Sequence, residues 1–151
     1  MRAGMSVLDF GCGPGGFSLA AGRLAGRHGR VYSVDVQPIA LRTVWRRAAR
    51  QGLGNVIPLS AERIGEIPDE SMDMVLAYDV LHIHPEPQWR RDVVGLLHRV
   101  LKPKGVLSAR DHHLDNTALT AMLTEGGLFR LVTEGRTCVG FERLERREPG
   151  G

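Results

Sequence analysis

The segment that most constrains the fold is Val7–Gly16, where a short apolar run containing Asp9 gives way to a glycine-rich turn. A helix is predicted to follow from Phe17 to Leu24. A second apolar run then ends in Asp35. A strand, a glycine turn, a helix and a second strand with a carboxylate at its tip are typical of a nucleoside-binding crevice. The glycine backbone lets the ligand approach, and the carboxylate accepts hydrogen bonds from ribose hydroxyls.

The length and composition indicate one globular domain, residues 1–151, because 42% of the residues are apolar and 25% are charged. No apolar run reaches the roughly 18 residues that cross a bilayer. Asp9 and the glycines also interrupt any pattern resembling a signal peptide. We therefore expect a cytoplasmic protein with no membrane partner.

The number of cysteines and the net charge exclude further classes of protein. Cys12 and Cys138 are too far apart in sequence to form a disulfide framework or a zinc site, so both are expected to be reduced. The net charge of +3 is small and scattered, which does not favour a nucleic-acid partner. Four arginines form a local cluster: Arg42, Arg46, Arg47 and Arg50. We interpret them as the solvated face of a helix; the alternative is a contact with an acidic partner or RNA.

Strand and helix patterns alternate along the chain. Short aliphatic runs bounded by glycine, proline or acids predict five strands: Met5–Phe10, Arg30–Asp35, Asn55–Leu59, Met72–Tyr78 and Lys104–Arg110. Further helices are expected from Pro38 to about Gly52, from Pro87 to about Leu101, and from Asn116 to about Glu125. Leu41, Val44, Trp45 and Ala48 form the expected apolar stripe of the first of these.

The last quarter of the chain departs from this alternation. Leu128–Glu134 and Thr137–Leu144 are two strand-like runs separated by Gly135-Arg136, which is typical of an antiparallel hairpin. Strand–helix alternation elsewhere predicts a parallel sheet with helices on both faces. The sequence therefore predicts an α/β fold of Rossmann-like type: a doubly wound, mostly parallel, seven-stranded sheet that ends in a C-terminal antiparallel hairpin.

The residues around the glycine turn narrow the choice of ligand. Gly11-x-Gly13-x-x-Gly16 alone is a weak dinucleotide signal. Asp9, two residues before the first glycine, would be awkward beside a pyrophosphate but suits a ligand with an ammonium group. S-adenosylmethionine (SAM) has an ammonium, a sulfonium and a carboxylate, and no phosphate.

At this point the chain resembles the class I SAM-dependent methyltransferases, over essentially its whole length. Six segments carry the resemblance in the family's order: Val7–Gly16, Asp35, Pro68–Val75, Tyr78–His82, Leu101–Leu107 and Gly126–Phe129. Among subgroups it is most similar to the small-molecule, type 11-like enzymes. The family usually has cap helices before the first strand, whereas here that strand is expected to begin by about Met5.

The resemblance implies a set of cofactor-binding residues. The backbone of Gly11, Cys12 and Gly13 would lie along the methionine part of SAM, and Asp9 would help to hold the ammonium. Asp35 would accept both ribose hydroxyls, Val36 would pack on the adenine, and the backbone around Tyr78 would receive the ammonium. Before Ala61 the family usually has an acid that binds the adenine amino group. This chain has Ser60 there, so either Ser60 or Glu62 is expected to make that contact.

Six polar residues follow two strands that should be neighbours, and they are expected to converge at one mouth: Asp79, His82, His84, Asp111, His112 and His113. Three interpretations stand. They shape or solvate the pocket; one of them, His82 or His112, is a general base with Asp79 nearby; or His82, His84 and His112 bind a metal. No metal is assigned, because no spacing here is diagnostic. His28 and His98 are expected on helix surfaces.

The predicted function is transfer of a methyl group from SAM to a small-molecule acceptor by in-line displacement. One alternative is a SAM-binding or S-adenosylhomocysteine-binding protein without catalysis, such as a partner subunit that lacks a substrate cap. A homodimer would be one way to complete such a pocket. The other alternative is a nicotinamide-binding oxidoreductase, which Asp9 and the terminal hairpin disfavour.

Overall fold

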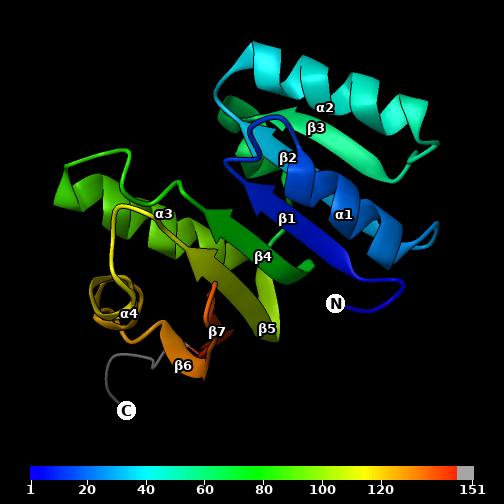
Figure 1. The fold of residues 1–151 in the computed structure, drawn as a ribbon. Helices are drawn as coiled ribbons and strands as arrows, with labels where there is room; N and C mark the ends of the chain where they lie inside the picture. Colours follow the sequence, from blue (N-terminus) through cyan, green and yellow to red (C-terminus); the bar gives the residue numbers. More distant parts are fainter. Residues whose placement is uncertain (146–151) are drawn as a thin grey trace.

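The computed structural model describes residues 1–145, which form the predicted Rossmann-like α/β fold (Figure 1). One seven-stranded sheet has the order β3-β2-β1-β4-β5-β7-β6. The strands are β1 (Ser6–Phe10), β2 (Arg30–Asp35), β3 (Val56–Ser60), β4 (Met72–Tyr78), β5 (Leu101–Arg110), β6 (Phe129–Glu134) and β7 (Val139–Arg143). β1 to β5 pair in parallel, whereas β7 pairs antiparallel with both β5 and β6. The predicted hairpin is therefore confirmed.

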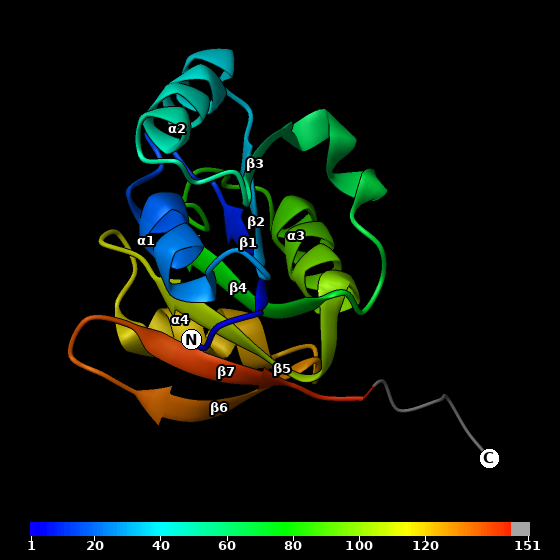
Figure 2. The same ribbon diagram turned by 90° about the vertical axis from the view of Figure 1, so that its right-hand side faces the viewer.

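The helices cover both faces of the sheet. They are α1 (Gly16–Ala25), α2 (Pro38–Arg50), α3 (Pro87–Val100) and α4 (Asn116–Thr124), with a short 3-10 helix η1 (Ala61–Glu66). Figure 2 shows α1 and α2 on one side of the sheet and α3 on the other. Two separate core clusters follow from this arrangement: α1 and α2 contribute to one, α3 and α4 to the other.

Neighbouring residues of one strand enter different cores because successive side chains point to opposite faces. Val7 belongs to the α1/α2 cluster and Leu8 to the α3/α4 cluster, and both are fully buried. Central parallel strands that are covered on both sides read as continuous apolar runs rather than as alternating ones. This explains the aliphatic runs by which the strands were predicted.

Element boundaries differ slightly from the predictions. β5 begins at Leu101, directly after α3 and before the predicted Lys104, and its pairing with β4 shifts register between Met72 and Met74. The early start fits Pro103, because a proline cannot continue the preceding helix. η1 was not predicted, since six residues are too few to show a helical period.

Two predicted side-chain positions are wrong. Trp45 is 63% exposed, because the buried stripe of α2 runs through Val44 and Ala48 and the next residue turns outward. His98 is 1% exposed rather than on a surface: its Nε2 lies 2.7 Å from the Leu144 carbonyl oxygen. His28 is exposed, but it lies in the turn after α1.

Among residues 1–145, no helix combines the length and apolar character needed to cross a membrane.

Candidate functional site

The glycine turn after β1 has a backbone that only glycine adopts easily. Gly11, Gly13 and Gly15 have φ values of 75°, 49° and 82°, in the left-handed region. A Cβ on Gly11 would lie 2.6 Å from a methyl carbon of Val80, so a side chain there is excluded by space as well. The turn therefore presents bare backbone at the carboxyl end of the sheet.

Asp35, the last residue of β2, accepts a hydrogen bond from this turn. One carboxylate oxygen accepts from the Gly13 N–H at 2.8 Å and the other from the Gln37 N–H at 2.9 Å. Because each carboxylate oxygen has two lone pairs, both keep one acceptor position. These bonds orient the carboxylate and leave it able to accept two vicinal hydroxyls.

Asp9 lies beneath the turn rather than at its surface. It is 2% exposed, and Ser18 donates its hydroxyl to the carboxylate at 2.5 Å. Burial raises the pKa of Asp9 to about 6, although the hydrogen bonds from Ser18 act in the opposite direction. Burial and the two nearby aspartates also raise the pKa of Cys12 to about 12, so its thiol is not a nucleophile at neutral pH.

A cavity of about 380 Å³ opens beside the turn. Five of the residues predicted for the site line it: Gly11, Asp35, Val36, Ala61 and Asp79. Its other walls are mostly apolar: Phe10, Val34, Ile64, Val80, Ile83, Trp89, Val93 and Leu96. Sequence reasoning did not assign these to the site. The apolar stripe of α3 was visible in the sequence, but its position facing this cavity depends on tertiary packing.

The remaining predicted cofactor residues do not line the cavity. Asp9, Cys12 and Gly13 lie behind or within the turn, and Glu62 is exposed on η1. Ser60 stands opposite Asp35 in the β2–β3 pairing.

Tyr78 ends β4 next to the cavity, but its ring faces other residues. The ring packs edge-on against Phe17 with centroids 4.5 Å apart, and its hydroxyl lies 2.8 Å from the Ser108 hydroxyl. Burial raises the pKa of Tyr78 above its usual value. The predicted contact is with the backbone of Tyr78, which is the last residue of β4.

Two aspartate–histidine pairs cross between the loops after β4 and β5. Asp79, after β4, accepts from both the backbone N–H and the Nδ1 of His112, at 2.9 and 2.8 Å. Asp111, after β5, does the same for His82, at 3.2 and 2.9 Å. The His113 ring lies 4.1 Å from the His82 ring, centroid to centroid. The structure thus brings together residues that were expected to meet because their strands are neighbours.

The bond to an aspartate determines which nitrogen of each histidine ring donates and which accepts. A carboxylate on Nδ1 makes that nitrogen the donor, which leaves Nε2 of a neutral ring as the acceptor. Asp79 has a φ of 54°, an uncommon backbone that aspartate tolerates. Although burial opposes it, the hydrogen bonds from His112 and the charge of Arg110, 3.3 Å away, hold the pKa of Asp79 below its usual value. Asp79 is therefore an anionic anchor for His112.

His84 takes no part in these pairs. Its ring stacks on Trp89 with centroids 5.3 Å apart. Within residues 1–145, no three histidine, cysteine or acidic side chains are arranged to hold a metal ion.

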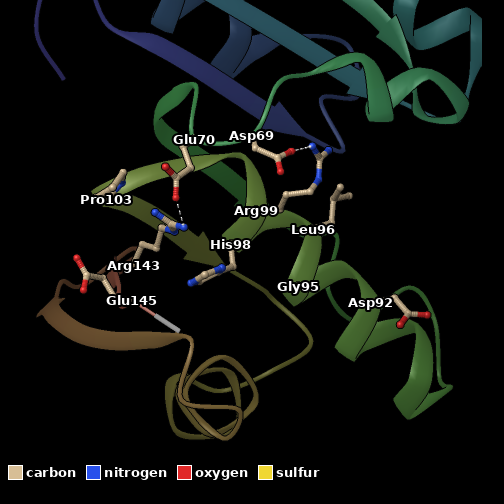
Figure 3. A pocket seen from close by; sticks show the side chains of 10 residues that line it. All are labelled: Asp69, Glu70, Asp92, Gly95, Leu96, His98, Arg99, Pro103, Arg143 and Glu145. Carbon is tan, nitrogen blue, oxygen red and sulfur yellow. Dashed lines mark hydrogen bonds and ion pairs between the residues drawn. The ribbon is translucent and has the colours of Figure 1, made fainter. Parts of the chain in front are cut away.

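A larger cavity, of about 870 Å³, lies near the amino ends of β4 and β5 (Figure 3). Four of its charged side chains form two pairs: Arg143 donates to Glu70 at 2.6 Å, and Arg99 bonds to Asp69. None of the predicted site residues lines it. Ligands of open α/β sheets bind at the carboxyl ends of the strands, so the smaller cavity beside the glycine turn is the candidate site.

Comparison with known proteins indicates the family to which the chain belongs. A family model described as "Methyltransferase domain" matches residues 1–140. The chain is 29% identical to a probable cobalt-precorrin-6B C(15)-methyltransferase (decarboxylating) of Saccharolobus solfataricus, over 89% of this chain and 67% of that protein. It is 32% identical to an arsenite methyltransferase of Halobacterium salinarum, over 74% of this chain. The chain spans only 28% of that protein's length.

A solved structure shows the same fold. The crystal structure of a SAM-dependent methyltransferase from Aquifex aeolicus superposes with a TM-score of 0.77 at 25% identity, over 94% of this chain and 82% of that one. The family match, the relatives and the fold together show that the chain belongs to the methyltransferase domain family and is a SAM-dependent methyltransferase.

Proposed function

We propose that the chain methylates a small-molecule acceptor at the mouth of the cavity beside the glycine turn, and that His112 takes the acceptor's proton. SAM, when bound, supplies a methyl carbon activated by its sulfonium. The protein's tasks are then to hold that nucleoside, to orient the acceptor in line with the methyl–sulfur bond, and to receive a proton.

The residues present suit SAM. A cavity of about 380 Å³ is within the usual range for small-ligand sites, roughly 300–1,000 Å³. Asp35 keeps two acceptor positions for the ribose hydroxyls, and the bare backbone of Gly11 admits the amino-acid part. Val36 lines the cavity yet is 69% exposed, so its apolar surface is free to pack against an adenine ring. The buried Asp9 would act on the ammonium from beneath the turn.

The observation that carries the catalytic assignment is the double role of Asp79. It lines the cavity, and it holds His112 by Nδ1 at 2.8 Å. His112 does not itself line the cavity, and its side chain is 69% exposed, so the assignment rests on its contact with Asp79. In this proposal the Nε2 acceptor of His112 meets the acceptor's proton at the cavity's rim. His82, held in the same way by the fully buried carboxylate of Asp111, is the second candidate base.

Two arguments support a small acceptor. The cavity holds only about 380 Å³, and Asp35 and Asp79 are the charged residues among its otherwise largely apolar lining. Two relatives carry small acceptors in their names, a cobalt-precorrin and arsenite.

The test is methyl transfer from radiolabelled SAM to a panel of thiols, phenols and quinols. His112→Gln should lower kcat about 100-fold or more, because a positioned base contributes roughly 10²–10⁴-fold. Its affinity for S-adenosylhomocysteine should stay within about twofold of wild type, because His112 orients no part of the nucleoside. His28→Gln, a change at an exposed turn, is the matched control.

An unchanged rate in His112→Gln, or equal losses of rate and affinity, would contradict a role as base. If the wild-type protein binds the nucleoside but methylates no member of the panel, the small-molecule assignment fails.

A further inference from the structure

Charge is distributed very unevenly along this chain. Residues 1–55 contain eight arginines and only two acidic residues, whereas residues 56–151 contain twelve lysines and arginines and fifteen acidic residues. The net charge of +3 conceals this division. Such asymmetry between parts of one chain suggests a polyanionic partner.

Five of these arginines lie on α1 and α2, which cover one side of the sheet (Figure 2): Arg23, Arg42, Arg46, Arg47 and Arg50. Arg42, Arg46 and Arg50 are exposed along α2 at four-residue intervals, which places successive ones about 6 Å apart. Within residues 1–145, no carboxylate forms an ion pair with any arginine of residues 1–55. In contrast, Arg63, Arg99, Arg110, Arg130 and Arg143 are all paired.

A cavity of about 620 Å³ continues this surface at the ends of α1 and α2. Three arginines and five glycines line it, with no acidic residue: Arg23, Arg27, Arg30, Gly22, Gly26, Gly29, Gly52 and Gly54, together with Leu53, Asn55 and Ile57. No atom lies within 4 Å of a Cβ placed on Gly26, Gly52 or Gly54, so bare backbone is accessible to a ligand there.

The helix end beside this cavity repels an anion less than an uncapped helix C-terminus would. The side-chain amide of Asn55 donates to the carbonyl oxygens of both Gly22 and Gly26, at 2.9 Å each. These last carbonyls of α1 are therefore already satisfied. Arg23 donates to Gln51 at 2.5 Å, which connects the cavity to the residue that caps the end of α2.

Trp45 adds an aromatic surface among these cations. It is 63% exposed and stands beside Arg46 and one helical turn from Arg42. Arginine binds phosphate through two parallel hydrogen bonds and stacks on bases, and an exposed tryptophan stacks a base of any sequence. Arginines interspersed with an exposed aromatic side chain are typical of a surface that binds single-stranded nucleic acid.

A lipid surface fits less well. Membrane-surface helices separate an apolar face from a cationic one. The apolar face of α2 is packed against the sheet through Val44 and Ala48, and its exposed Ile39 and Trp45 stand among the arginines.

We propose that the α1/α2 face binds single-stranded nucleic acid, with backbone phosphates in the cavity of Arg23, Arg27 and Arg30 and a base stacked on Trp45. This surface lies outside the cofactor cavity, and its occupant is separate from the proposed acceptor. The inference therefore does not depend on the proposed function.

The test is fluorescence anisotropy of a labelled oligouridylate of about 16 nucleotides, titrated over a salt series. The wild type should bind at low salt and weaken as salt rises. Arg27→Ala should reduce the steepness of that dependence by about 0.7, the value for one phosphate contact on a single strand. Arg27→Glu with Arg46→Glu should lose at least about tenfold in affinity, and Trp45→Ala about tenfold with an unchanged salt slope.

Arg91→Glu is the matched control, because Arg91 is an exposed helical arginine of α3 that has no carboxylate partner among residues 1–145. It should retain wild-type affinity for the oligonucleotide. Every variant should keep wild-type affinity for S-adenosylhomocysteine, which separates this test from that of the cofactor site. No binding at low salt, or an equal loss in Arg91→Glu, would overturn the proposal. Binding to phosphatidylserine vesicles that the oligonucleotide does not displace would overturn it in favour of a membrane surface.

Discussion

At the scale of single residues, Asp9 shows the sharpest conflict between stability and binding. Its folded-state pKa of about 6 exceeds the ordinary value of 3.8, because burial penalises the charged form. The folded protein therefore binds more protons than the unfolded chain between these values, and its stability falls as pH rises through them. Above about pH 6 the full cost of a buried carboxylate remains.

Asp9→Asn should remove this cost, because an amide oxygen still accepts the Ser18 hydroxyl. The free energy of unfolding should exceed that of wild type by up to about 3 kcal/mol near pH 7, and the difference should shrink to near zero below about pH 4. Urea unfolding across this range measures it. A difference that does not vary with pH would contradict the raised pKa of Asp9.

The same carboxylate predicts a pH dependence of binding in the opposite direction. A ligand ammonium favours ionised Asp9, so wild-type affinity for S-adenosylhomocysteine should increase as pH rises through about 6. Calorimetry should find that Asp9→Asn lacks this increase and binds more weakly above it. Identical pH profiles for the two proteins would exclude Asp9 from ammonium binding.

Substitutions of Gly11 and Gly13 by alanine can be compared directly. Both have positive φ values, but only at Gly11 would a Cβ meet a neighbour, Val80, at 2.6 Å. Gly11→Ala should therefore destabilise the protein by more than Gly13→Ala, which bears only a backbone cost of about 1–3 kcal/mol. Val80→Ala should cost less in the Gly11→Ala background than in wild type. Additive losses in denaturant unfolding would rule out the steric explanation.

At the scale of elements, the helix starts differ in how they are capped. Asp115 accepts the Ala118 N–H at 2.7 Å and so caps α4, whereas Glu86 makes no such bond at the start of α3. Asp115→Ala should cost about 1 kcal/mol and lower Tm by about 2–4 °C. Glu86→Ala should leave Tm unchanged in the same thermal scan. Equal effects of the two substitutions would show that the cap is not the cause.

Helices and strands could be predicted from the sequence where the local residue pattern agreed with the fold. Aliphatic runs between glycines and acids identified the strands, and Gly135-Arg136 marked the hairpin. Trp45 and His98 were misplaced because a helical period alone does not say which neighbour a side chain meets. His98 is polar, yet it is buried at the Leu144 carbonyl, a contact 46 residues away in sequence.

At the scale of the whole molecule, the sequence predicted that the loops after β4 and β5 would meet, but not how their residues would pair. Asp79 holds His112 and Asp111 holds His82, and each pair crosses from one loop to the other. Asp79 also has a left-handed backbone, which no local sequence pattern predicted. The excess of arginine in residues 1–55 is visible in the sequence. That these arginines form no ion pair within residues 1–145 was not predictable, because pairing depends on the fold.

The measurement that tests the account most directly is calorimetry with S-adenosylhomocysteine on wild type and Asp35→Ala. The wild type should release heat and saturate. Asp35→Ala should lose at least about tenfold in affinity, because each charge-assisted hydrogen bond contributes roughly 1.5–3 kcal/mol. Well-folded wild-type protein that gives no heat at millimolar nucleoside, or an Asp35→Ala variant that binds as tightly as wild type, would contradict the assignment of the cavity beside the glycine turn.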